Sequence, residues 1–84
     1  MYRRSPDYDL VIRVDFDQSG RNWSLDSFTF DAQLDDLAVI IATALFKERV
    51  DSSPSGSRLT ACLFRGTEIL RNFEASRGIL IESS

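Results

Sequence analysis

The chain has 84 residues, of which 10 are basic, 13 are acidic, none is histidine and one is cysteine, so its formal net charge is −3. A domain usually needs about 100–200 residues, so residues 1–84 form a single small domain with a small core. The lack of histidine excludes histidine-based triads, proton relays and metal sites. The single cysteine excludes an intramolecular disulfide.

The first residues, 1–7, begin basic and then turn acidic, so they lack the apolar run of a secretory signal. The longest apolar stretch, 37–46, is far shorter than the roughly 20 residues that a membrane-spanning helix needs. We therefore expect a cytoplasmic protein that does not associate with membranes.

The first third of the chain predicts an antiparallel hairpin. Residues 8–17 alternate between apolar and polar side chains, which is typical of a half-buried strand. Residues 18–22 have turn chemistry, and residues 23–30 are rich in aromatic side chains and predict a second strand. The alternation of this second strand slips near Asp26 and Ser27, which predicts a bulge or a bend there.

A long helix is predicted over residues 32–50, with Asp31 as its N-cap. Asp35 and Asp36 then fall in the first turn, where the helix dipole favours negative charge. The polar, serine-rich residues 51–58 that follow predict a flexible loop.

The last third predicts strands at 59–64 and 79–82, separated by an ambiguous segment at 67–77. Ile69, Leu70 and Phe73 share one helical arc, whereas neither face of the alternative strand is uniformly apolar. The sequence thus predicts a two-layer α+β domain with one long helix packed on a mixed sheet. The element order is ββαβαβ, with ββαβββ as the alternative.

Residues 15–26 resemble an EF-hand calcium loop. Acids stand at the first, third and twelfth places, a serine at the fifth and a glycine at the sixth. The twelfth place is Asp26 where the motif has glutamate, the eighth is Asn22 where it has an apolar residue, and the flanks predict strands. We expect an acidic hairpin without a metal site or any other cofactor, with a calcium-stabilised binding domain as the alternative.

Catalytic chemistry has little support in the sequence. Cys62 lies in an apolar strand with no histidine to activate it, so we expect a buried and unreactive thiol. The many carboxylates include no pair that the sequence marks as facing a cleft, although a small carboxylate-based enzyme is a further alternative. We therefore expect no enzyme.

The predicted helix has two apolar arcs. At about 100° per residue the broad arc should pack on the sheet, and it contains Leu34, Leu37, Ala38, Ile40, Ile41, Ala44 and Leu45. Val39, Phe46 and Val50 form a second stripe, which a chain of this size has little material to cover. We expect this stripe to contact a partner protein or a second copy in a homodimer, or alternatively to be covered by residues 67–77.

A second candidate surface is an acidic patch of Asp9, Asp15 and Asp17 on the solvent face of the hairpin. The acidic balance and the absence of a basic run disfavour nucleic acid as a partner. The sequence as a whole predicts a non-catalytic protein–protein interaction module. Such a small acidic domain would suit an inhibitor or regulator, for example a phage-encoded blocker of host machinery.

Overall fold

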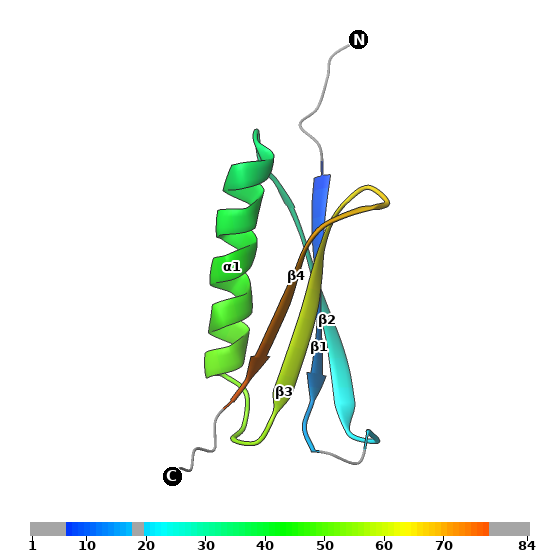
Figure 1. The fold of residues 1–84 in the computed structure, drawn as a ribbon, viewed down its shortest axis with the longest axis vertical. Helices are drawn as coiled ribbons and strands as arrows, with labels where there is room; N and C mark the ends of the chain where they lie inside the picture. Colours follow the sequence, from blue (N-terminus) through cyan, green and yellow to red (C-terminus); the bar gives the residue numbers. More distant parts are fainter. Residues whose placement is uncertain (1–6, 18–19, 78–84) are drawn as a thin grey trace.

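The structure, a computed structural model, describes residues 7–17 and 20–77. It contains four strands and one helix in a two-layer arrangement, with the helix along one face of the sheet (Figure 1). The elements are β1 (Asp7–Asp15), β2 (Trp23–Asp31), α1 (Asp35–Asp51), β3 (Arg58–Arg65) and β4 (Glu68–Ser76). The strand order is β2-β1-β3-β4, and each neighbouring pair is antiparallel. The predicted α+β class is confirmed.

The predicted helix at 67–77 is wrong, because this segment forms β4, and the sheet of the described strands is antiparallel, not mixed. The helix-like spacing has a physical cause. The β3–β4 register shifts between Leu63 and Phe64, and this bulge lets Leu70 and Phe73, three residues apart, both pack against the core. The final strand predicted at 79–82 lies outside the described residues.

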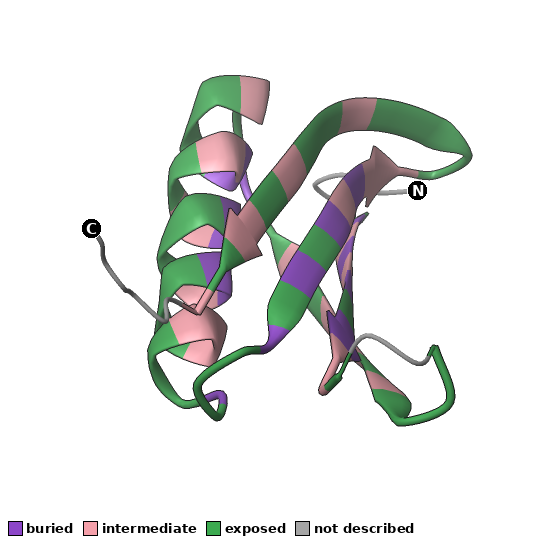
Figure 2. Ribbon diagram, turned by 60° about the horizontal axis from the view of Figure 1, so that its bottom comes forward, coloured by how far each residue is buried: buried purple, intermediate pink, exposed green. Residues whose placement is uncertain are grey.

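The core lies between α1 and the two central strands. The apolar residues of β1 and β3 that face the helix are almost fully buried, whereas β2 and β4 contain no fully buried residue (Figure 2). The buried residues on β1 and β3 are Tyr8, Leu10, Ile12, Val14, Leu59, Ala61 and Leu63. The strict alternation of β1 in the sequence thus gave the correct inward face.

The helix contacts the sheet through Ala38, Ala42 and Phe46, which follow one another at four-residue intervals. Two alanines bring the helix close to the strands. The Phe46 ring then packs on Phe73 of β4, with the ring centroids 5.3 Å apart. The helix begins at Asp35 with Leu34 at the N-cap, so Asp31 is not the cap as predicted but the last residue of β2.

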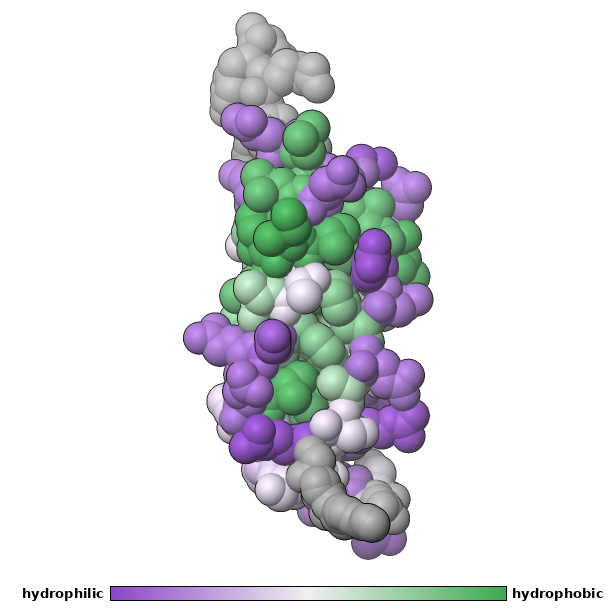
Figure 3. Space-filling view, turned by 60° about the vertical axis from the view of Figure 1, so that its left-hand side comes forward, coloured by the Kyte–Doolittle hydropathy of each residue, from purple (hydrophilic) through white to green (hydrophobic). Residues whose placement is uncertain are grey.

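The helix is rotated relative to the prediction, so only part of the broad arc faces the sheet: Ala38 is buried, and Ile41 and Leu45 pack partly against the core. Leu34, Leu37 and Ile40, expected against the sheet, are exposed, at 67, 43 and 65%. Figure 3 shows hydrophobic residues gathered on this side of the molecule over the first half of α1, with hydrophilic residues along their right-hand border and in the lower half. The helix therefore presents an apolar outer patch, which we call the helix patch (Leu34, Leu37 and Ile40).

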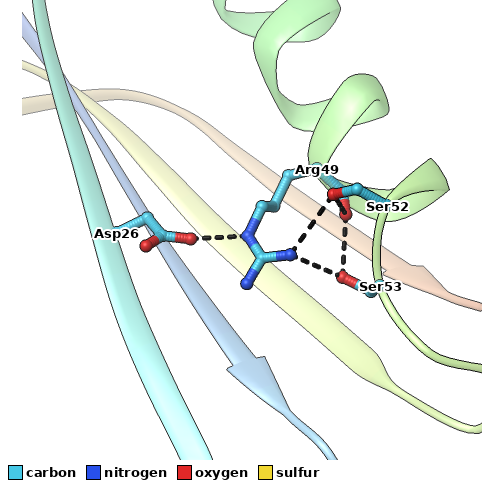
Figure 4. Close-up of polar contacts among 4 residues, drawn as sticks. All are labelled: Asp26, Arg49, Ser52 and Ser53. Carbon is cyan, nitrogen blue, oxygen red and sulfur yellow. Dashed lines mark hydrogen bonds and ion pairs between the residues drawn. The ribbon is translucent and has the colours of Figure 1, made fainter.

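An arginine near the end of the helix ties α1 to the edge strand β2 (Figure 4). Arg49 Nε donates to Asp26 Oδ2 at 2.5 Å, and Arg49 Nη1 donates to Ser53 Oγ at 3.1 Å. Asp26 points to the helix side of β2, and the β1–β2 register runs without interruption past it. The predicted bulge at Asp26 and Ser27 is therefore wrong, and the slip in alternation reflects a carboxylate placed inward to meet Arg49.

Arg49→Gln should lower the free energy of unfolding by about 1 kcal/mol, because both partners are partly shielded from water. Arg58→Gln is the control, since Arg58 pairs with Glu74 where both side chains are more than 60% exposed, and it should have almost no effect. Urea unfolding followed by circular dichroism measures both variants. Equal losses would show that Arg49 does not tie the helix to β2.

At the opposite end of the helix, Asp35 joins α1 to the two central strands. The Tyr8 hydroxyl donates to Asp35 Oδ1 at 2.7 Å, and Arg65 Nη1 donates to both Asp35 oxygens at 2.9 and 2.8 Å. The Tyr8 pKa is raised, first by this hydrogen bond from its hydroxyl to Asp35 and next by burial, because both favour the protonated phenol. Asp35 is thus the first residue of α1, and its contacts with Tyr8 and Arg65 fix the position of the helix start over the sheet.

The raised Tyr8 pKa predicts a loss of stability in alkali. The hydroxyl contributes fully below the ordinary tyrosine pKa of about 10, and its contribution disappears as pH rises through the raised pKa. Unfolding by urea from pH about 8 to about 11 should show this decline in the wild type and a smaller decline in Tyr8→Phe. The same decline in Tyr8→Phe would contradict the assignment.

The segment expected to be a flexible loop, residues 51–58, makes several hydrogen bonds. Ser53 and Ser57 are buried, and the backbone N–H groups of Gly56 and Arg77 donate to the carbonyls of Arg77 and Ser57. These bonds hold the segment beside the end of β4. The flexibility of residues 51–58 stays a prediction, and these hydrogen bonds argue against it.

Candidate interaction surface

The sheet face opposite α1, which we call the open face, carries the candidate site. In β1, the residues that alternate with the buried ones are Asp9, Val11, Arg13 and Asp15, and they point away from the helix. The antiparallel register extends this face across all four strands, because directly paired residues project to the same side. The helix therefore covers one face of the sheet and leaves this one without a covering element among the described residues.

Apolar side chains cross the open face on a diagonal from β2 to β4. Leu25 lies diagonally beside Val11, Val11 pairs with Cys62, and Phe64 pairs with Ile69. We call this set the apolar diagonal: Trp23, Leu25, Val11, Cys62, Phe64 and Ile69. Its two ends are well exposed, with Trp23 at 47%, Leu25 at 57% and Ile69 at 54%. A solvated sheet face usually carries polar side chains, so a continuous apolar line points to a binding surface.

The diagonal has an aromatic anchor and a shallow hollow. The Arg13 guanidinium lies over the Trp23 ring, 4.8 Å from its centroid, which fixes the position of the indole. A hollow of about 170 Å³ lies at the centre of the face, lined by Val11, Arg13, Thr60, Ala61, Cys62 and Phe64. It is smaller than the roughly 300–1,000 Å³ of typical small-molecule sites, so it suits an inserted side chain from a protein surface.

The predicted acidic patch of Asp9, Asp15 and Asp17 does not form as a single-sign surface. Asp9 and Asp15 do lie on the open face, but Asp9 accepts a hydrogen bond from Thr29 and Asp15 pairs with Arg13 at 3.0 Å. Asp17, beyond the end of β1, accepts from the Asn22 side chain at 2.6 Å. The carboxylates thus flank the apolar diagonal together with arginines, giving it a mixed-charge border.

Cys62 is not buried as predicted. The prediction assumed that a strand with two apolar faces is buried on both sides. Cys62 lies instead on the open face, half-buried at the middle of the apolar diagonal. Its Sγ donates to Asn72 Oδ1 on β4 at 3.2 Å. The thiol is therefore part of the candidate surface, and its low reactivity stays a prediction.

The structure does not assemble the calcium-like loop at 15–26. Asp15 is on the open face with Arg13, whereas Asp26 is on the helix face with Arg49. The first and twelfth positions of the motif are therefore on opposite sides of the sheet. In the described part of the chain, no cluster of three or more acidic or cysteine side chains is placed to hold a metal ion.

The stripe of Val39, Phe46 and Val50, proposed from the sequence as a contact surface, faces the sheet instead. Phe46 is only 7% exposed, and Val39 and Val50 are partly buried against the core. The alternative given above is confirmed, because Phe73 from the 67–77 segment covers Phe46. The stripe is thus internal, and a dimer through it is not compatible with this fold.

Sequence reasoning missed most of the apolar diagonal. It did not single out Trp23, Leu25, Phe64 or Ile69 as contact residues, although the slip in the alternation of β2 was a signal. Apolar residues occupy odd positions before the slip and even positions after it. In an unbulged strand this places Trp23 and Leu25 on the face away from the core.

Comparison of the chain with protein-family models, with curated proteins and with solved structures finds no match. Within the described residues, no helix has both the length and the apolarity needed to cross a membrane.

Proposed function

We propose that this chain is a non-catalytic protein-binding module and that the open face of its sheet is the binding surface. The observation that carries the proposal is the apolar diagonal, which exposes a tryptophan, a leucine and an isoleucine on a face that no element of residues 7–17 and 20–77 covers. Burying these side chains against a partner would provide the main favourable term in binding.

The composition of the open face supports this proposal. Protein interfaces combine an apolar centre rich in aromatic residues with a polar border, and Trp and Arg dominate their hot spots. Here Trp23 and Phe64 lie on the diagonal, Arg13 holds the Trp23 ring, and the Arg58–Glu74 pair lies toward one corner. The helix patch is a second apolar surface, but it has three residues on one element and no aromatic side chain.

The module would act by covering a surface of its partner, as an inhibitor or regulator does. We propose a protein as the partner in preference to nucleic acid, because the chain is acidic and the open face mixes both signs of charge. A cytoplasmic location belongs to the same proposal, since the single partly exposed Cys62 suits a reducing compartment.

Leu25→Glu tests the surface with little harm to the fold, because Leu25 pairs directly with Arg13, which can accommodate a carboxylate. The tagged variant should capture at least about tenfold less partner protein from an extract of the source cells than the wild type. Ile40→Glu is the matched control, since it places the same charge on a similarly exposed residue of the helix patch. Equal capture by the Leu25 variant, or loss only in the Ile40 variant, would refute the proposed surface.

A further inference from the structure

We infer that the occupant of the open face is a second copy of this chain, packed face to face about a two-fold axis along the apolar diagonal. The inference rests on the proposed function and deepens it, because it names the partner. In this arrangement each residue of the diagonal meets its own counterpart, and Cys62 of one copy faces Cys62 of the other.

The size of the face fits a weak dimer. Strands of eight or nine residues at about 3.3 Å per residue, four of them about 4.8 Å apart, give a face of roughly 500 Å². Two such faces in full contact would bury roughly 1,000 Å², near the lower limit for a specific interface, and the separated corners reduce this area. The dimer should therefore be weak and dissociate on dilution.

The diagonal course of the apolar residues fits the geometry of two twisted sheets. When such sheets cross at a large angle, they approach most closely along one diagonal and separate at the other two corners. A two-fold axis along the diagonal gives such a crossing, because the diagonal is inclined to the strands on both copies. The polar corners, with Thr29 and Asp9 at one and Arg58 and Ser76 at the other, then lie where water has access.

The charges of the open face favour a copy over a strongly charged partner. Arg13 and Arg58 each pair with a carboxylate of their own chain, at 3.0 and 2.6 Å. Neither guanidinium therefore requires an acid from outside, and the acids Asp7, Asp9 and Asp31 gather at one corner of the face, away from the apolar diagonal. Within the part of the chain that the structure describes, nothing covers the apolar diagonal, and a second copy would cover it with a sheet of the same twist.

Sedimentation equilibrium of the purified protein, from low micromolar to several hundred micromolar, measures the association. We expect a reversible monomer–dimer equilibrium in the wild type and in Ile40→Glu, and a dimer at least tenfold weaker in Leu25→Glu. A wild type that is monomeric throughout would overturn the inference. Capture of a different protein that Leu25→Glu abolishes would then leave the proposed function standing, and capture unchanged by Leu25→Glu would overturn both.

The single cysteine gives a second test that needs no disruptive variant. A short bismaleimide should link two wild-type chains through Cys62 at concentrations where the dimer forms, in an incubation long enough for a monofunctional maleimide to label this half-buried thiol. The double variant Cys62→Ser with Ile40→Cys moves the only thiol to the helix patch and should not become linked. Linkage through position 40 but not through Cys62 would place the contact on the helix and overturn the inference, as would no linkage through Cys62 in a proven dimer.

Discussion

Phe46→Ala should lower the free energy of unfolding by about 3–5 kcal/mol, the range for removing a buried aromatic ring. Phe46 is 7% exposed, and its ring fills the space between the second half of α1 and Phe73 of β4. A domain of this size has a total stability of about 4–12 kcal/mol, so the loss is a large part of it. The melting temperature should fall by about 15 °C or more.

Thermal and urea unfolding of Phe46→Ala, beside Ile40→Ala, measure this effect. Ile40 is on the same helix but 65% exposed, so its truncation should cost less than about 1 kcal/mol. If both variants lost the same small amount, Phe46 would be on the outside of the helix and the helix would be rotated relative to the structure described here.

Ala42→Leu should destabilise the protein by about 1–3 kcal/mol, because it adds side-chain volume to a core that is already filled. Ala42 is fully buried in the middle of the line along which the helix contacts the sheet, between Ala38 and Phe46. A larger side chain there must push the helix away from β1 and β3, which also weakens the packing of Phe46.

The same substitution at Ala44 separates packing from helix propensity. Ala44 is exposed, and alanine and leucine have similar helix propensities, so Ala44→Leu should change stability by less than about 0.5 kcal/mol. Circular dichroism during urea unfolding reports both variants. A neutral Ala42→Leu would mean that the helix is not held against the sheet at this point.

The sequence was sufficient where one periodicity dominated. The strict alternation of β1 gave both the strand and its buried face, including Leu10, Ile12 and Val14. The helix was also predicted, but its orientation was predicted only in part, because both of its faces are apolar and periodicity does not rank them. The helix can lie close to the sheet only through a face with small side chains. The face that contains Ala38 and Ala42 therefore packs inward.

The candidate surface could be predicted only in part, because two irregular features depend on tertiary contacts. The inward Asp26 is explained by Arg49, a residue distant in sequence, so the slip in β2 could be noticed but not interpreted. The bulge in β4 depends on its pairing with β3, so the spacing of Leu70 and Phe73 favoured a helix. Once these two features are known, the outward apolar residues Trp23, Leu25, Phe64 and Ile69 fall on one continuous face.

The pairing of β1 with β3 also determines when this protein can fold. The β1–β2 and β3–β4 hairpins close over short turns, whereas the central pairing places Tyr8 opposite Arg65. Closing that long loop is the entropically costly step, so hairpins form in microseconds and the complete sheet forms more slowly. During synthesis the first hairpin leaves the ribosome long before β3 exists. The apolar side chains on its inward face therefore lack the packing of β3 until nearly the whole described chain has been synthesised.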